Sequence, residues 1–252
     1  MQAGSNNRKG RPSEYRGHLT PAQVAEGMNA AKRNARRLAA DAKLLLDAGR
    51  LPTAAAIAAL SIEESGKISI LREIALATSR QELNEVWKRY RDHRSKNGAW
   101  ILLDLVRQGA RRLDDFAEVV NRDGEHTALL NSLKQLGFYT DCYGRAHWSE
   151  PARIFEGNEA KLAHFLVSLA ELLARSSETP TREIELWIGH MRPVWQTPDM
   201  AFGLLRFADA MFREGLTATS PNEYARFVFG GPEAADRQDR NPSDQQPLSG
   251  RS

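Results

Sequence analysis

The chain has 252 residues, of which 41% are hydrophobic and 27% charged, proportions typical of a soluble globular protein. It lacks an apolar run of about eighteen residues, so the sequence predicts no membrane span, and the N-terminal residues lack the apolar stretch of a secretory signal. Cys142 is the only cysteine, which excludes an internal disulfide and a cysteine-based zinc site and fits the reducing cytoplasm.

The formal net charge of +3 is unevenly distributed. Residues 1–19 are polar and carry four basic residues against one glutamate, whereas residues 231–252 are rich in Asp, Gln, Pro and Ser. We expect a disordered basic arm over 1–19, a single helical domain over 20–230 and a disordered tail over 231–252. A uniformly basic nucleic-acid surface is not indicated, although the arm could contact RNA.

Two long helices joined by a tight turn are predicted between Thr20 and Ala77. Thr20 suits an N-cap, Pro21 the first helical position, and Gln23 can close a capping box. Apolar residues then recur at alternating steps of four and three, which marks one face for close packing: Val24, Met28, Ala31, Ala35, Leu38, Ala42 and Leu45. So short a connection predicts an antiparallel hairpin that forms the core.

The second helix carries charged residues among apolar ones. Glu64 and Lys67 fall on its apolar stripe, and Glu63 also lies one turn before Lys67. Buried charges are tolerated only when they are paired or otherwise satisfied. Two interpretations stay open: an ion pair within the helix at the edge of the core, or charged groups that face a functional site or a partner helix.

A third helix is predicted from a Ser-Arg-Gln-Glu capping box at residue 79 into a basic segment that ends at Lys96. Arg89, His93 and Lys96 are spaced i, i+4 and i+7, which would place them on one helix face. Such a face needs an anionic neighbour, and a phosphate or the Glu64 carboxylate would serve. Histidine can transfer a proton while arginine and lysine neutralise a phosphorane-like transition state, so the spacing suits metal-independent RNA cleavage. The alternative is a solvated basic face with an incidental histidine.

A fourth helix is expected from Ala99 to about Val120, and a short one from Thr127 to Leu136. The segment 137–151 then combines aromatic residues with glycines and a proline without a helical period, which predicts a short extended insert near 138–150. Tyr139 and Asp141 are expected to anchor this insert by hydrogen bonds.

Helical patterns resume over about 158–175, and prolines at 180, 198 and 221 open further C-terminal helices. The predicted class is therefore all-α. The chain has no His-x-x-x-His or Glu-x-x-His spacing, no phosphate-binding glycine loop and no serine elbow, so the sequence supports neither a metal centre nor a cofactor site.

Several segments, in this order, resemble the AbiV family of abortive infection proteins. The Glu-Glu-x-Gly-Lys and Gly-aromatic-Tyr-x-Asp pieces are specific when they occur together, and the resemblance spans roughly residues 24–175. The matching positions are Asn34, Leu38, Asp41-Ala42, Leu45, Gly49, Ala55, Ser61-Ile62-Glu63-Glu64-Ser65-Gly66-Lys67, Asp92-His93-Arg94-Ser95-Lys96, Leu136-Gly137-Phe138-Tyr139-Thr140-Asp141, Trp148 and Pro151.

The resemblance implies a helical core over about residues 20–136 that is similar to HEPN domains, many of which are dimeric ribonucleases with an Arg-(four to six residues)-His motif. Here only three residues separate Arg89 from His93, and only Lys88 gives a spacing of four. Carried over to this chain, the motif assigns His93 as the catalytic residue and Arg89 or Lys96 as its phosphate-binding partner. Glu64 and Lys67 would orient them if the hairpin packs against the third helix.

Two functions follow from the resemblance, both in anti-phage defence in the bacterial cytoplasm. The first is a HEPN-type endoribonuclease, a homodimer without cofactor or metal, that cleaves RNA and halts translation. The second is a non-catalytic protein that binds a phage protein or the translation machinery. The implied partners are RNA and a phage-encoded activator or target.

Overall fold

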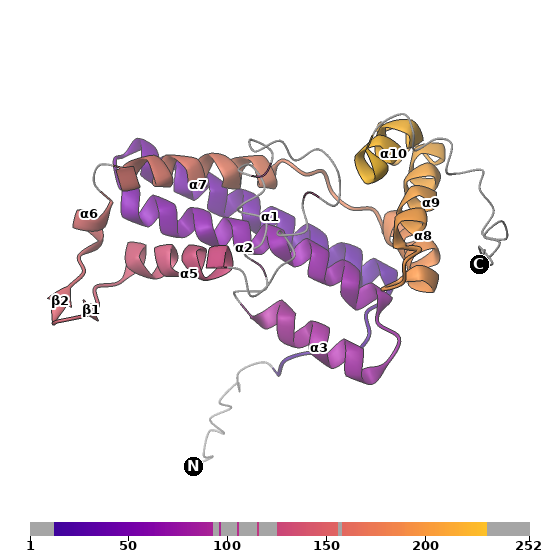
Figure 1. Ribbon diagram of the computed structural model, residues 1–252, viewed down its shortest axis with the longest axis horizontal. Helices are drawn as coiled ribbons and strands as arrows, with labels where there is room; N and C mark the ends of the chain where they lie inside the picture. Colours follow the sequence, from indigo (N-terminus) through magenta and orange to yellow (C-terminus); the bar gives the residue numbers. More distant parts are fainter. Residues whose placement is uncertain are drawn as a thin grey trace, which may run out of the picture.

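The structure, a computed structural model, describes residues 13–92, 96, 105, 115, 125–155 and 158–230. Its described part is helical apart from one small hairpin (Figure 1), which confirms the predicted all-α class. In chain order the elements are α1 (Pro21–Asp47), α2 (Leu51–Leu76), α3 (Arg80–Arg91), α5 (Glu125–Phe138), β1 (Cys142–Tyr143), β2 (His147–Trp148), α6 (Pro151–Ile154), α7 (Asn158–Ala174), α8 (Thr181–Met191), the 3-10 turn η4 (Arg192–Val194), α9 (Met200–Arg213) and α10 (Pro221–Phe229).

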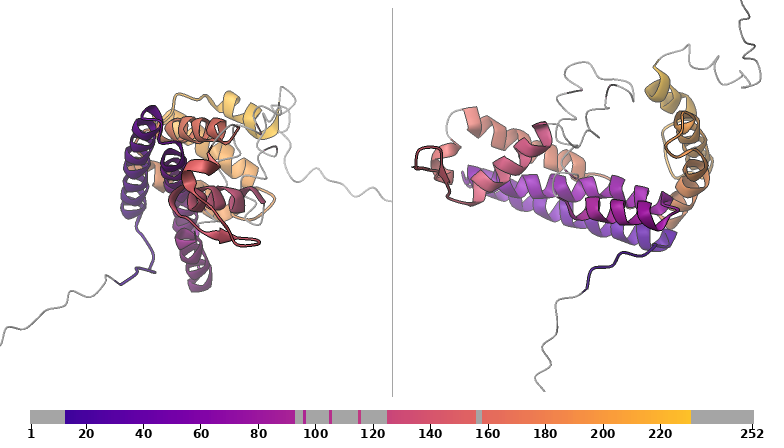
Figure 2. Two further views of the ribbon diagram at one scale, coloured as in Figure 1. Left: turned by 90° about the vertical axis from the view of Figure 1, so that its left-hand side faces the viewer. Right: turned by 60° about the horizontal axis from the view of Figure 1, so that its bottom comes forward.

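Helices α1 and α2 form the predicted antiparallel hairpin and lie side by side over their length (Figures 1 and 2). The capping box at the start of α1 is present, since the Gln23 amide donates to Thr20 Oγ1 at 3.3 Å and the Thr20 amide donates to Gln23 Oε1 at 2.9 Å. The buried Ser61 hydroxyl donates to the Ala35 carbonyl at 2.8 Å. This bond joins the two helices where small side chains let their backbones approach.

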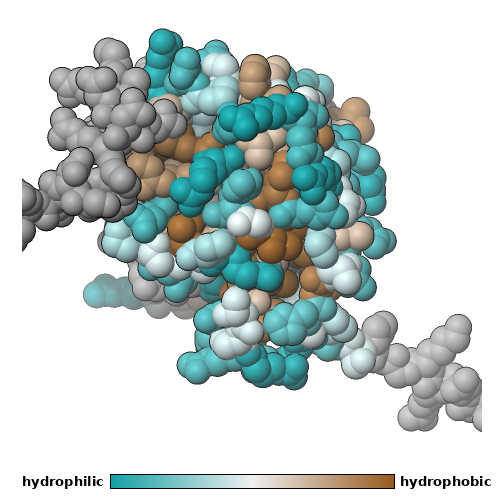
Figure 3. All heavy atoms as spheres, turned by 90° about the vertical axis from the view of Figure 1, so that its right-hand side faces the viewer, coloured by the Kyte–Doolittle hydropathy of each residue, from teal (hydrophilic) through white to brown (hydrophobic). Residues whose placement is uncertain are grey.

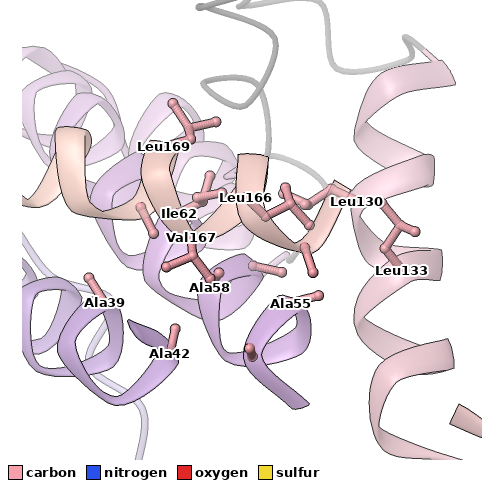
Figure 4. Close-up of a cluster of buried hydrophobic side chains, with 14 of the residues drawn as sticks. Ala39, Ala42, Ala55, Ala58, Ile62, Leu130, Leu133, Leu166, Val167 and Leu169 are labelled. Atoms are coloured by element: carbon pink, nitrogen blue, oxygen red, sulfur yellow. The ribbon is translucent and has the colours of Figure 1, made fainter. Parts of the chain in front are cut away.

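Helix α2 is the central element and contacts α1, α3, α5, α6, α7 and α8. Its first half, with α1, α5 and α7, encloses one core cluster in which alanines of the hairpin face larger aliphatic residues (Figure 4): Ala39, Ala42, Ala55, Ala58, Ile62, Leu130, Leu166, Val167 and Leu169. Its second half packs in a separate cluster with the start of α1, with α3 and with Ile184 of α8. The hairpin therefore organises both halves of the core, as the sequence predicts.

Helix α5 extends through Phe138, two residues beyond the predicted end at Leu136. A Cβ atom on Gly137 would lie 2.5 Å from the Pro52 carbonyl oxygen and 3.0 Å from the Ala56 Cβ. The absence of a side chain therefore lets the last turn of α5 touch the first turn of α2.

Residues 14–18 pack on α3, although the sequence predicts disorder through Leu19. The Trp87 indole N–H donates to the Gly17 carbonyl at 3.0 Å, and Arg91 Nη2 donates to the Tyr15 carbonyl at 2.6 Å. The Tyr15 ring meets the Trp87 ring edge to face, with centroids 6.1 Å apart. The rest of the predicted arm, residues 1–12, the predicted tail, 231–252, and the body of the predicted helix over 99–120 lie outside the described residues.

The link between α7 and α8 is fixed to α1 by polar contacts. The Lys32 ammonium donates to the Ser177 carbonyl at 2.6 Å and to Thr179 Oγ1 at 2.7 Å, and Asn29 exchanges two hydrogen bonds with the Thr179 backbone. Burial lowers the pKa of Lys32. These bonds satisfy a buried ammonium and hold the start of α8 against the hairpin.

The C-terminal helices α8, α9 and α10 cover the end of the hairpin opposite β1 and β2 (Figure 1). Apolar residues form separate patches among polar ones on this end of the molecule (Figure 3). The exposed aromatic side chains of α9 and α10 are Phe202, Phe212 and Phe227.

We expect Gly137→Ala to destabilise the protein by about 1–3 kcal/mol, because a methyl group there must push α5 away from α2. Urea unfolding followed by circular dichroism measures the change. Gly189→Ala in α8 is the matched control, since a Cβ at Gly189 meets nothing within 4 Å. An equal loss of stability in both variants would contradict the close contact.

Candidate functional site

A buried ion pair joins α2 to α5 in the interior. Lys134 Nζ lies 2.6 Å from Glu63 Oε1, and the two side chains are only 7% and 4% exposed. Charges so deeply buried are stable only as a pair, because either alone would lose its hydration without compensation. Glu63 is thereby fixed in place and marks one side of the candidate site.

Glu64, the residue after Glu63, forms a second ion pair with Lys67, which lies one turn further along α2. Lys67 Nζ lies 2.5 Å from Glu64 Oε1, and both side chains are less than one-fifth exposed. The same ammonium lies 5.5 Å from the centroid of the Tyr90 ring, which connects α2 to α3. The ion pair within the helix, one of the two interpretations that the sequence leaves open, is therefore present, and its lysine also faces a neighbouring helix.

Lys96 adds a third ammonium group to these four residues. It is 6% exposed, and its pKa is lowered chiefly by desolvation. Glu63 and Glu64 act on it as attractive charges, and Lys67 and Lys134 as repulsive ones. We call the five residues Glu63, Glu64, Lys67, Lys96 and Lys134 the lysine–glutamate cluster. Among the described residues it holds one more cation than anions.

Gly66 brings the backbone of Lys96 onto α2. A Cβ atom on Gly66 would lie 2.1 Å from the Lys96 carbonyl oxygen, closer than any real contact. Glycine in a helix interior costs roughly 0.5–1 kcal/mol relative to alanine. The glycine of the Glu-Glu-x-Gly-Lys segment therefore leaves the space in which the Lys96 backbone packs against α2.

Arg89, on α3, contacts α2 at a different point, nearer the C-terminal end of α2. Its guanidinium is paired with Glu73, and both side chains are less than one-quarter exposed. Glu73 follows Glu63 by ten positions, which is about 15 Å along a helix axis. The structure therefore does not bring Arg89 to Glu64, as the predicted packing required.

A cavity of about 390 Å³ surrounds the Arg89–Glu73 pair. It is lined by α3, by the end of α2 and by the Trp195–Gln196 corner, and it contains two further glutamates, Glu82 and Glu85. Hydrogen bonds from the backbone of Thr78 and Ser79 lower the pKa of Glu82, so its carboxylate stays ionised. Three carboxylates beside one guanidinium make this cavity unfavourable for a phosphate.

The end of α3 explains why Arg89 and Lys96 separate. The helix stops at Arg91, and Asp92 is extended with φ −76° and ψ 129°. The prediction that Arg89, His93 and Lys96 share one face of a continuous helix is therefore wrong. His93 itself lies outside the described residues.

Asp141 and Tyr139, the other predicted site residues, belong to the hairpin region. Asp141 Oδ1 accepts from the Cys142 amide at 2.7 Å, and the Asp141 carbonyl accepts from the Ser149 amide at 2.7 Å. Tyr139 is 61% exposed and its ring contacts Phe138 edge to face. Asp141 thus anchors the insert, whereas Tyr139 projects into solvent.

The described ranges hold neither a metal-binding group nor a membrane-spanning helix. There, no three histidine, cysteine, aspartate or glutamate side chains are grouped so that they could hold a metal ion. None of the helices in these ranges combines the length and apolar character that a bilayer crossing demands.

Comparison with known proteins adds one match. The family model described as AbiV, of the HEPN class, matches residues 23–175. No curated protein and no solved structure matches the chain. The matched segment contains all five residues of the lysine–glutamate cluster and ends before α8.

Sequence reasoning missed Lys134 and Glu73, which are partners of Glu63 and Arg89. Lys134 lies on the buried side of α5, three positions before Gly137, and a lysine at an apolar helical position could have signalled it. Glu73 is an ordinary charged residue within the helical pattern of α2, and nothing in the sequence near it predicts that it pairs with Arg89.

We expect Lys134→Met to cost about 3–5 kcal/mol of unfolding free energy, because it removes the hydrogen-bonded partner of the buried Glu63 carboxylate. Urea unfolding measures the loss. The double variant Glu63→Met, Lys134→Met should recover part of it. Lys43→Met is the control, since Lys43 forms an exposed pair with Asp47 at 2.5 Å and such pairs contribute up to about 1 kcal/mol. A similar cost for both single variants would show that the buried pair is not structural.

Proposed function

The chain belongs to the AbiV family of HEPN proteins, and we propose that it acts in abortive-infection defence against phage by cleaving RNA without a metal. In this proposal the protein works as a homodimer in the bacterial cytoplasm and stops translation in the infected cell. RNA is the substrate, and a phage-encoded molecule is the activator or target.

The observation that supports cleavage is the position of Lys96. Its carbonyl rests on Gly66, and its side chain is within electrostatic range of Glu63 and Glu64 in a cluster of three lysines and two glutamates. Lys96 follows His93 by three positions in the sequence, so a change in the anchoring of Lys96 would act on the segment that carries the proposed catalytic histidine. The burial of Lys96 makes it a positioning residue that also contributes to the local positive potential.

The chemistry that this arrangement suits is attack of a ribose 2′-hydroxyl on the adjacent phosphate. His93 would accept the 2′ proton as the 2′-oxygen bonds to phosphorus. The 5′-oxygen would leave and take a proton, which yields a 2′,3′-cyclic phosphate and a free 5′-hydroxyl. Ammonium groups near the phosphate stabilise the charge that grows on its oxygens.

One observation favours the alternative, a defence protein that only binds its target. Arg89, the arginine of the proposed motif, is paired with Glu73 among further glutamates and not with a carboxylate of the lysine–glutamate cluster. In this alternative the basic residues have no catalytic role, and protection depends on an exposed binding surface.

The test compares RNA from infected and uninfected cells that carry the wild-type protein or His93→Ala, together with plaque counts. We expect discrete RNA fragments only with the wild type, and a loss of cleavage of about 100-fold or more with His93→Ala, because acid–base catalysis contributes at least that much. Lost protection should accompany it. Intact RNA in both strains with full protection would overturn cleavage and favour the binding function.

Gly66→Ala tests the positioning of Lys96. A methyl group on Gly66 cannot coexist with the Lys96 carbonyl at 2.1 Å, so we expect RNA cleavage to fall at least about 100-fold if the displaced segment carries an essential proton-transfer group. Circular dichroism checks that the helices remain folded. Gly27→Ala in α1 is the control, because its added Cβ would lie at an ordinary 3.6 Å from Leu71. Wild-type cleavage by Gly66→Ala would refute the positioning role.

A further inference from the structure

The hairpin of β1 and β2 projects beyond the end of the helices, away from the core (Figures 1 and 2). Its strands pair with Cys142 opposite Trp148 and Tyr143 opposite His147. Both strands are exposed. Opposite residues share a face, so one face carries Tyr143 and His147 and the other carries Trp148 and Cys142.

Polar bonds, rather than aromatic packing, hold this hairpin together. The Asp141 amide donates to Ser149 Oγ at 2.9 Å, and the Ser149 amide donates to the Asp141 carbonyl at 2.7 Å. Gly144 and Ala146 form the turn in left-handed conformations with φ of 55° and 59°. The hairpin is therefore held by polar bonds, including one between the Tyr143 side chain and Asp141, and not by packing of its rings against one another.

Those rings are unusually open to solvent. Trp148 is 73% exposed, Tyr139 61% and Tyr143 47%. Single exposed apolar residues are common, but a group of aromatic side chains on one projecting element is typical of a binding surface. We call Tyr139, Tyr143 and Trp148 the aromatic hairpin group.

Cations accompany the aromatic hairpin group. Arg145 lies in the turn of the hairpin, and Arg50 lies in the connection between α1 and α2. That connection is at the same end of the molecule, because Pro52 contacts the last turn of α5 at Gly137. In the ranges that the structure describes, neither arginine forms an ion pair, whereas Arg153 is balanced by Glu150 at 3.2 Å.

Exposed aromatic faces beside unpaired guanidinium groups are the combination that binds single-stranded nucleic acid, since bases stack on the rings and phosphates meet the cations. We propose that the hairpin binds single-stranded RNA, with one unpaired base stacked on Tyr143 on one face, another on Trp148 on the opposite face, and phosphates near Arg145 and Arg50. This inference rests on the proposed function, in which RNA is the substrate.

The route to the lysine–glutamate cluster supports this reading. Lys134 lies four residues before the last residue of α5, about 6 Å along the helix axis, and the hairpin follows directly after α5. The hairpin is therefore joined by a short segment to the C-terminal end of α5, and a strand held on the hairpin would lie close to that end. The hairpin would select unpaired RNA and deliver it toward the proposed site.

Fluorescence anisotropy with the full chain tests the proposal, using a labelled twelve-residue oligo(U) and a duplex RNA of equal length as probes. We expect Trp148→Ala and Tyr143→Ala each to weaken oligo(U) binding at least about fivefold, as for removal of one stacking ring. Duplex binding should not change, because its bases are already stacked. Arg145→Ala should reduce the slope of affinity against salt by about one.

Phe212→Ala is the control, since Phe212 is 43% exposed on α9 at the other end of the molecule. Thermal melting verifies that each variant is folded. Equal oligo(U) affinity in Trp148→Ala, Tyr143→Ala and wild type would overturn the proposal. So would a wild type that binds no oligo(U), an outcome that would make the aromatic hairpin group a surface for a protein partner instead.

The same assay with His93→Ala separates this inference from the proposed function. Oligo(U) binding that depends on Trp148, without cleavage by the wild type, would retain the hairpin and reject catalysis. Cleavage that requires His93, with unchanged oligo(U) affinity in Trp148→Ala and Tyr143→Ala, would retain catalysis and reject the hairpin.

Discussion

Burial of the first half of α2 on every side is the constraint on which the structure depends. Ala54, Ala55 and Ala56 are all buried, although consecutive residues of a helix point about 100° apart. A helix that is apolar around its whole circumference is stable only inside a bundle. Helices α1, α3, α5, α7 and α8 supply that enclosure, and small side chains on α1 and α2 let the layers pack closely.

The same enclosure determines the electrostatics of the candidate site. Because α2 also carries Glu63, Glu64 and Lys67, the segments that pack on it must supply groups that compensate these buried charges. Lys134 from α5 and Lys96 from the segment after α3 fulfil that requirement. The site is thus a consequence of packing, because its charges come from three separate parts of the chain and meet only on α2.

The two ends of the bundle differ in how deeply their tryptophan side chains are buried. At the end covered by α8 and α9, Trp187 and Phe207 are buried together with Arg72, whose guanidinium lies 5.0 Å from the Trp187 ring and is paired with Glu183. At the end where α5 stops, Tyr143 and Trp148 remain in solvent on a hairpin held by its backbone. Trp187 and Phe207 stabilise the first end, whereas Tyr143 and Trp148 are available for binding at the second. The family match covers the second end and stops before α8.

Local signals in the sequence determined the class, most of the helices and the family. The capping boxes at Thr20 and Ser79, the apolar spacing of α1 and the Glu64–Lys67 pair all depend on residues within four positions of one another, so neighbouring letters are enough to predict them. The position of the extended insert followed from its glycines, proline and aromatic residues in the same way.

Only the tertiary structure decided which charges meet. Glu63 and Lys134 are 71 positions apart, and Arg89 pairs with Glu73 rather than lying near Glu64. Such partners depend on how whole helices are oriented relative to one another, and the spacing of residues within a short stretch of sequence does not predict that orientation. The same holds for Gly66 and Gly137, whose missing side chains are explained only by the backbones that touch them. The spacing of Arg89 and Lys96 is compatible with one helix, but α3 ends at Arg91 and the backbone of Asp92 is extended. The backbone of Lys96 packs on Gly66 instead, a contact that the spacing does not predict.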